Sequence, residues 1–139
     1  MIDPILATIV LSFITAQGLK IFLFISKGNQ KIHWKDLIVT GGMPSTHASV
    51  VTGLTLIIYM YSKTSPFFFI TLVFSLITLR DAIGVRRAVG EEGKIINQII
   101  EKTKLKLPEN HYALGHTPFE VLLGMAIGTA CAIGVWWAI

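Results

Sequence analysis

Long apolar segments alternate with shorter polar ones along the chain, and this pattern predicts a bundle of membrane helices. About 20 apolar residues are needed to cross the hydrocarbon core of a bilayer. Four segments approach that length, and we expect transmembrane helices over residues 5–26, 46–61, 66–87 and 118–139. The second of these is short for a full crossing. It suffices only if its N-terminal end is buried in protein.

A fifth segment has a different helical pattern. Between residues 91 and 106, charged residues alternate with isoleucines at helical spacing, at positions 95, 96, 99 and 100. This arrangement predicts an amphipathic helix that lies on the membrane surface or against the bundle. The expected fold is therefore an all-α integral membrane protein with a single domain over residues 1–139. It would be a small helical bundle of about four transmembrane helices plus one interfacial amphipathic helix.

Composition and charge placement agree with this interpretation. The chain is 53% hydrophobic and 14% charged, whereas soluble proteins carry roughly 25% charged residues. Ten of the twelve Lys and Arg residues lie in the connections 27–45 and 80–116. The positive-inside rule then places both connections in the cytoplasm and both termini outside. We expect a protein of the cell (cytoplasmic) membrane, with a retained first helix and no nucleic-acid partner.

The single cysteine, Cys131, excludes an intrachain disulfide and a zinc site of Cys/His spacing. It lies in an apolar run and is expected to be a small buried hydrophobic residue.

Three polar clusters fall on the same side of the predicted membrane. The first is Pro44-Ser45-Thr46-His47, which follows two glycines and opens a helix. The second is Asp81 with Arg86 and Arg87, and the third is the segment 115–120. A helix N-terminus presents free N–H groups and a dipole that favours negative charge, so an anion site is expected at this end of the bundle.

The side chains in these clusters are those that phosphoryl transfer through a phosphohistidine needs. One imidazole attacks phosphorus, a carboxylate one helical turn away holds that ring in one tautomer, and a second imidazole protonates the leaving oxygen. Cations and helix N–H groups stabilise the equatorial oxygens. The predicted chemistry requires neither a metal nor another cofactor.

Each of these residues also has a purely structural interpretation. Thr117-Pro118-Phe119-Glu120 has the pattern of a capping box with proline at the first helical position. Ser45 is a good N-cap for the second helix. The Arg86–Arg87 pair suits an anchor for anionic headgroups, with Asp81 as its ion-pair partner. Lys20, inside the first helix, either snorkels to the interface or faces a polar site together with Gln17.

The same residues carry a resemblance to a known family. Pro44-Ser45-Thr46-His47 resembles the Pro-Ser-Gly-His motif of the type 2 phosphatidic acid phosphatases (PAP2), which are related to acid phosphatases and vanadium-dependent haloperoxidases. His116-x-x-x-Glu120 resembles the end of the third motif of that family, His-x-x-x-Asp. The runs 41–47, 81–87 and 114–121 are together similar to a small divergent branch of the family. Thr46 stands where the motif has glycine, and Glu120 stands where it has aspartate.

The resemblance implies roles for individual residues. His116 would be the nucleophile, Glu120 would orient its ring and His47 would be the general acid. Asp81 has no role in the resemblance, and its place near the arginines makes it either their ion-pair partner or a catalytic auxiliary. The residues implied in phosphate binding are Lys20, Gly42, Ser45, Thr46, Arg86 and Arg87.

The function expected from the residues and the resemblance is that of a membrane phosphatase. It would hydrolyse lipid-linked phosphate or pyrophosphate, of the isoprenoid or phosphatidate type, at an active site on the cytoplasmic side. Its partners would be the lipid phosphate substrate and membrane lipids. An alternative is a non-hydrolytic membrane protein that binds or moves anionic lipid or phosphate. A homodimer is a further hypothesis, because Gly124-x-x-x-Gly128 is a typical helix-contact pattern.

Overall fold

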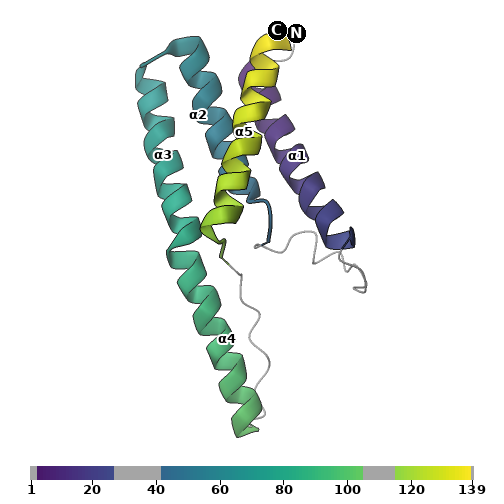
Figure 1. Cartoon of the computed structure of the whole chain (residues 1–139). Helices are drawn as coiled ribbons and strands as arrows, with labels where there is room; N and C mark the ends of the chain where they lie inside the picture. The colour runs from purple at the N-terminus through teal and green to yellow at the C-terminus, as the bar shows by residue number, and fades with distance from the viewer. Residues whose placement is uncertain (1–2, 27–41, 105–114, 139) are drawn as a thin grey trace.

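The computed structural model describes residues 3–26, 42–104 and 115–138, and all regular secondary structure in them is helical. The helices are α1 (Pro4–Ser26), α2 (Thr46–Ser62), α3 (Pro66–Ile83), α4 (Val85–Thr103) and α5 (Pro118–Ala138), as Figure 1 shows. The prediction of an all-α protein is confirmed.

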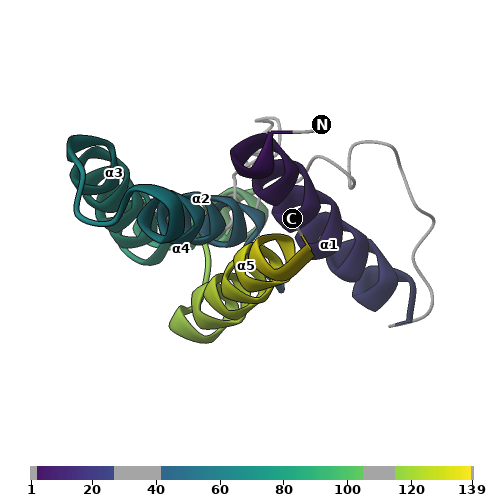
Figure 2. The same ribbon diagram turned by 90° about the horizontal axis from the view of Figure 1, so that it is seen from above.

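The central element of the bundle is α2, which lies between α3 on one side and α1 with α5 on the other (Figure 2). Small residues permit this close packing. A Cβ atom at Gly128 of α5 would clash with the backbone carbonyl of Ser49, and one at Gly124 would clash with that of Ser45. Lipid tails are as apolar as the helices, so membrane helices associate largely through such close contacts. The Gly124-x-x-x-Gly128 pattern is therefore used within the chain, and it no longer supports the predicted homodimer.

Hydroxyl side chains add hydrogen bonds between the helices. Ser49 Oγ donates to the carbonyl oxygen of Ser12 on α1 at 3.2 Å. On the other side of α2, Ser75 Oγ of α3 donates to the carbonyl oxygen of Val51 at 3.0 Å. In hydrocarbon, where water cannot compete, such bonds help to fix the register of neighbouring helices.

Three helical stretches are long and apolar enough to cross a membrane: Pro4–Ser26, Pro66–Thr103 and Pro118–Ala138. The chain is thus an integral membrane protein. The 17 residues of α2 span about 25 Å at 1.5 Å per residue, a little less than the hydrocarbon core of about 30 Å. At its N-terminal end Ser45 and Thr46 are buried in protein, whereas His47 is exposed.

The sequence predicted one uninterrupted helix over residues 66–87, and this is wrong at Gly84. There α3 ends and α4 begins, with backbone angles φ −96° and ψ −91°. The Gly84 N–H still donates to the Arg80 carbonyl at 2.9 Å, and its own carbonyl accepts from the Ala88 N–H at 3.0 Å. Glycine suits this interruption because a Cβ at this position would lie 3.0 Å from the Arg80 carbonyl oxygen.

The amphipathic helix begins earlier than predicted, at Val85 instead of residue 91. It leaves the bundle along the direction of α3 and does not lie across the end of the other helices (Figure 1). Its apolar residues, among them Val89, Ile95 and Ile99, are exposed in the isolated chain.

The two ends of the bundle differ in character. Both termini and the α2–α3 turn lie at one end (Figure 1). There Trp136 packs edge-on against Tyr61, with ring centroids 4.9 Å apart. At the other end α2 and α5 begin, and α1 and α3 finish (Figure 1). The three polar clusters therefore gather at one end, as the sequence predicted.

Candidate functional site

His116 is held in place mainly by backbone contacts with the junction of α3 and α4. Its N–H donates to the carbonyl oxygen of Ala82 at 3.1 Å. The preceding residue, Gly115, packs so closely on the backbone of Arg86 and Arg87 that a Cβ atom there would clash. As a result, only 6% of His116 is exposed. The segment that carries the histidine is thus fixed to the helix break at Gly84.

Glu120 serves both as a helix cap and as a partner of the His116 ring. Its Oε2 accepts from the Thr117 N–H at 2.9 Å, and Thr117 Oγ1 accepts from the Glu120 N–H at 3.3 Å. This is the reciprocal capping box that the sequence predicted. The same Oε2 lies 3.4 Å from His116 Nδ1, at the long end of hydrogen bonding. A carboxylate in this place favours the tautomer with a proton on Nδ1 and a free lone pair on Nε2.

The loop before α2 ties three helices together. The Ser45 N–H donates to the carbonyl oxygen of Glu120 at 3.1 Å, and Ser45 Oγ caps α2 by accepting from the Ala48 N–H at 3.4 Å. Thr46 Oγ1 donates to Gln17 Oε1 of α1 at 3.0 Å. Ser45 therefore acts as the helix cap that its sequence position indicated. His47 follows on the exposed side of the first turn of α2.

Charged groups from several helices converge on the two histidines. Lys20 lies on α1 one turn after Gln17 and is partly buried. Its ammonium acts electrostatically on His47, on His116 and on the Glu120 carboxylate. Arg86 and Asp81 act on His47. The polar-site interpretation of Lys20 therefore has direct support in its neighbours.

The two arginines point to different partners. Arg86 Nε forms an ion pair with Asp81 Oδ2 across the α3–α4 break. Arg87 Nε instead pairs with Glu91 Oε1 at 3.0 Å along the exposed side of α4. Only Arg86 of the two acts electrostatically on His47 within the described residues. Asp81 is thus the ion-pair partner that the structural interpretation expected.

Gly42 is the least engaged member of the predicted set. It is exposed at the start of the loop and has φ +78°, a conformation that glycine adopts without strain. In the described parts of the chain, no three His, Cys, Asp or Glu side chains are grouped so as to hold a metal ion.

The structural roles of two residues at the site, Ala82 and Gly115, escaped the sequence analysis. Ala82 supplies a carbonyl oxygen, and no side-chain pattern could reveal that role. Gly115 supplies the space for close backbone contact, and its position directly before a histidine was the available signal.

The environment of His116 lowers its pKa below the ordinary value of 6.5. Burial is the main cause and the positive charge of Lys20 the second, while the Glu120 carboxylate opposes both and His47 adds a further lowering. His116 is therefore a neutral imidazole at neutral pH. A neutral ring with a free Nε2 is the form that can attack an electrophile.

This pKa predicts the acid limb of the pH profile for a reaction that needs neutral His116. The limb of kcat/KM should have an apparent pKa below 6.5, because kcat/KM reports groups of the free enzyme. Lys20→Met removes a cation and should move the limb to higher pH. Glu120→Gln removes the opposing carboxylate and should move it to lower pH. Ionisation of the substrate affects the wild type and both variants alike. Shifts of the limb in the same direction in Lys20→Met and Glu120→Gln would therefore contradict its assignment to His116.

The fold and this cluster define a class of protein: an all-α membrane protein in which a buried histidine is paired with a partly buried carboxylate at one end of the bundle. A family model described as the divergent PAP2 family matches residues 1–131, and the chain belongs to this family. The chain is also similar to the uncharacterized membrane protein YuiD of Bacillus subtilis (strain 168), with 34% identity over 118 residues. The match covers 72% of this chain and 73% of YuiD. No solved structure matches the chain.

Proposed function

We propose that the protein is a membrane phosphatase that hydrolyses lipid-linked phosphate or pyrophosphate through a phosphohistidine on His116. One observation carries the proposal. The His116 ring is buried and its Nδ1 faces Glu120, while the charges of Lys20 and His47 act on the same ring. Membership of the divergent PAP2 family supports a phosphatase-related role.

In the first step, His116 Nε2 attacks phosphorus and the bond from phosphorus to the leaving oxygen breaks. The bound phosphate dianion favours the protonated form of His47, and this ring gives its proton to that oxygen, so that the lipid leaves as a neutral alcohol or a shorter phosphate. Lys20 and Arg86 stabilise the charge on the non-bridging oxygens. Glu120 stabilises the positive charge that develops on the His116 ring.

In the second step, a water molecule attacks the phosphohistidine. His47, now neutral, accepts the proton of that water, the N–P bond breaks and inorganic phosphate leaves. His116 returns to its neutral form and His47 to its protonated form. The exposed position of His47 suits both proton transfers, while the buried position of His116 shields the covalent intermediate.

Phosphate release by the detergent-purified protein tests the proposal. We expect release from prenyl and phosphatidyl phosphates that continues in the presence of a chelator. Vanadate, which mimics pentacoordinate phosphorus, should inhibit, and its tight binding should require His116. Loss of activity on chelation would contradict the metal-free mechanism.

The same vanadate experiment separates hydrolysis from simple binding of an anionic lipid or phosphate. The binding alternative would use the same cations and helix N-terminus without the covalent step, and in it Arg86 and Arg87 would exchange their carboxylate partners for the phosphate. A binder would take up phosphate or vanadate equally well in the wild type and in His116→Ala, and it would release no phosphate. An enzyme would lose vanadate binding in that variant.

We also propose that the site faces the cytoplasm. In intact cells, a membrane-impermeant thiol reagent should label Lys63→Cys, in the α2–α3 turn, and should not label Lys31→Cys. Both variants would be made in a Cys131→Ser background. The reverse labelling pattern would place the site on the outer face and change the lipid pool that it can reach.

A further inference from the structure

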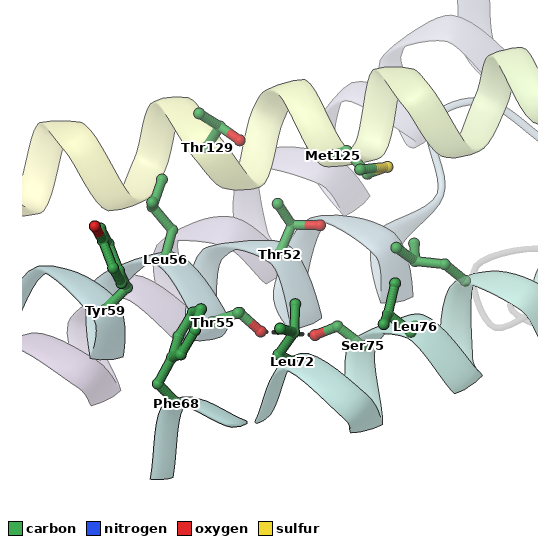
Figure 3. A pocket seen from close by; sticks show the side chains of 11 residues that line it. Thr52, Thr55, Leu56, Tyr59, Phe68, Leu72, Ser75, Leu76, Met125 and Thr129 are labelled. Atoms are coloured by element: carbon green, nitrogen blue, oxygen red, sulfur yellow. Dashed lines mark hydrogen bonds between the residues drawn. The ribbon is translucent and has the colours of Figure 1, made fainter. Parts of the chain in front are cut away.

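An apolar groove of about 450 Å³ opens between α2, α3 and α5. Its volume lies within the range of about 300–1,000 Å³ that is usual for ligand pockets. In Figure 3, Leu72 and Leu76 of α3 line one wall, and Met125 and Thr129 of α5 line the other. Both helices pack on α2, but they meet each other mainly around Ala82 and Val121 and separate toward the α2–α3 turn (Figure 1).

The groove begins directly beneath the candidate site. Leu79 and Met125, which line it, also pack against a small buried cluster of Ala48, Ala82 and Val121. Ala48 directly follows His47, and the carbonyl of Ala82 binds the His116 N–H. One buried layer of side chains therefore separates the end of the groove from the segments that carry the two histidines.

The groove ends at an aromatic pair near the opposite side of the bundle. The rings of Tyr59 and Phe68 line it and lie 5.2 Å apart between centroids. From Leu79 to Phe68 the wall of α3 runs for eleven residues, or about 16 Å at 1.5 Å per residue. The groove is thus elongated along the direction in which lipid chains lie in a bilayer.

The polar atoms of the groove are arranged to leave its wall apolar. Thr55 Oγ1 and Ser75 Oγ lie 2.7 Å apart (Figure 3), and each also lies within hydrogen-bond distance of the carbonyl oxygen of Val51, so their two protons are shared among these three acceptors. Thr52 Oγ1 has no hydrogen-bond partner among the described residues. Thr52 lies five residues after His47, at the part of the groove where the chain of a lipid would join its headgroup.

We propose that this groove holds the hydrocarbon chain of the lipid whose phosphate reaches His116. The inference rests on the proposed function and adds the place and length of the chain. Because bilayer lipid is as apolar as the groove, the groove adds little attraction for the chain. Its effect is to set the position of the phosphate, and a shift of about 1 Å in a reacting group can cost about 100-fold in rate.

Matched tryptophan variants on α3 test the groove. Leu76→Trp narrows it from the rim, whereas Ile77→Trp places the same side chain on the neighbouring exposed residue outside it. With a long-chain alkyl phosphate, kcat/KM should fall between about tenfold and 100-fold in Leu76→Trp and stay unchanged in Ile77→Trp. With ethyl phosphate, which has too short a chain to fill the groove, both variants should match the wild type.

A second pair on α5 covers the case in which Leu76→Trp fails to fold. Thr129→Phe should lower kcat/KM for the long-chain alkyl phosphate and leave that for ethyl phosphate unchanged, as expected for Leu76→Trp. Ala130→Phe, on the adjacent exposed residue, should lower neither. Equal losses on both substrates, or no loss in either groove variant, would overturn the inference.

Cross-linking separates failure of the groove from failure of the phosphatase. The probe is a non-hydrolysable alkyl phosphonate with a diazirine about 18 Å along its chain, because Tyr59 lies twelve residues after His47 on α2 and each residue adds 1.5 Å. It should label Tyr59 and Phe68 in the wild type and in His116→Ala, and the label should be lost in Leu76→Trp. Labelling without phosphate release would retain the groove and reject the phosphatase. Labelling spread over lipid-facing residues such as Ile77 would reject the groove.

Discussion

His116→Ala should abolish turnover, with a fall in kcat on the order of 10⁴ or more, because the nucleophile itself is removed. The fold should survive, since the backbone N–H of residue 116, not its side chain, makes the contact with Ala82. Phosphate release from a lipid phosphate measures the loss. His33→Ala is the matched control and should keep full activity, because this histidine has no partner pattern in the sequence.

His47→Ala should cost less, and its cost should depend on the leaving group. General acid–base catalysis contributes roughly 10²–10⁴-fold. A lipid alcohol needs a proton as it leaves, whereas an acidic phenol does not. The variant should therefore be much less impaired with an aryl phosphate of low leaving-group pKa than with a lipid phosphate. An equal loss on both substrates would remove His47 from the role of proton donor.

The second large effect is expected from Gly128→Ala at the contact between α5 and α2. The added Cβ would clash with the backbone carbonyl of Ser49 and lie 2.9 Å from Gly53 N. Backbone cannot rotate away as a side chain can, so the helices must separate. Overpacking costs typically 1–3 kcal/mol, and the thermal unfolding temperature in detergent should fall. Activity should fall with it, since Ser45 and Glu120 connect the same two helices at the site.

Gly134→Ala is the control on the same helix. A Cβ at this position meets no atom within 4 Å. Alanine is favoured over glycine in a helix interior by roughly 0.8–1 kcal/mol, so this variant should be as stable as the wild type or slightly more so. Similar unfolding temperatures for the two variants would contradict the packing described for Gly128.

Much of the site could be predicted from sequence because its parts are local. The capping box of Thr117 and Glu120 places the carboxylate one turn from His116 by helix geometry alone. The alternation of four predicted membrane spans placed all three polar clusters at one end of the bundle. The short length of α2 likewise pointed to burial of its N-terminal end, where Ser45 and Thr46 are buried and His47 is exposed.

The features that sequence did not predict depend on contacts between distant segments. The Gly84 break was missed because the hydrogen bonds of α3 and α4 continue on both sides of it and no turn pattern marks it. The choice between Arg86 and Arg87 depends on which direction each side chain takes after that break. The role of Gly124 and Gly128 was ambiguous, since a small-residue pattern fits a neighbouring helix and a second copy equally well. The groove arises from the separation of α3 and α5, which no local pattern encodes.

The central claim is a covalent bond between His116 Nε2 and phosphorus, and direct trapping of that bond tests it. The protein would be mixed with excess lipid phosphate, quenched within milliseconds under alkaline conditions that preserve phosphohistidine, digested and mapped by mass spectrometry. We expect phosphate on His116 in the wild type, more of it in Glu120→Gln if breakdown is slowed, and none in His116→Ala. Steady hydrolysis by a protein that never carries phosphate on His116 would contradict the mechanism.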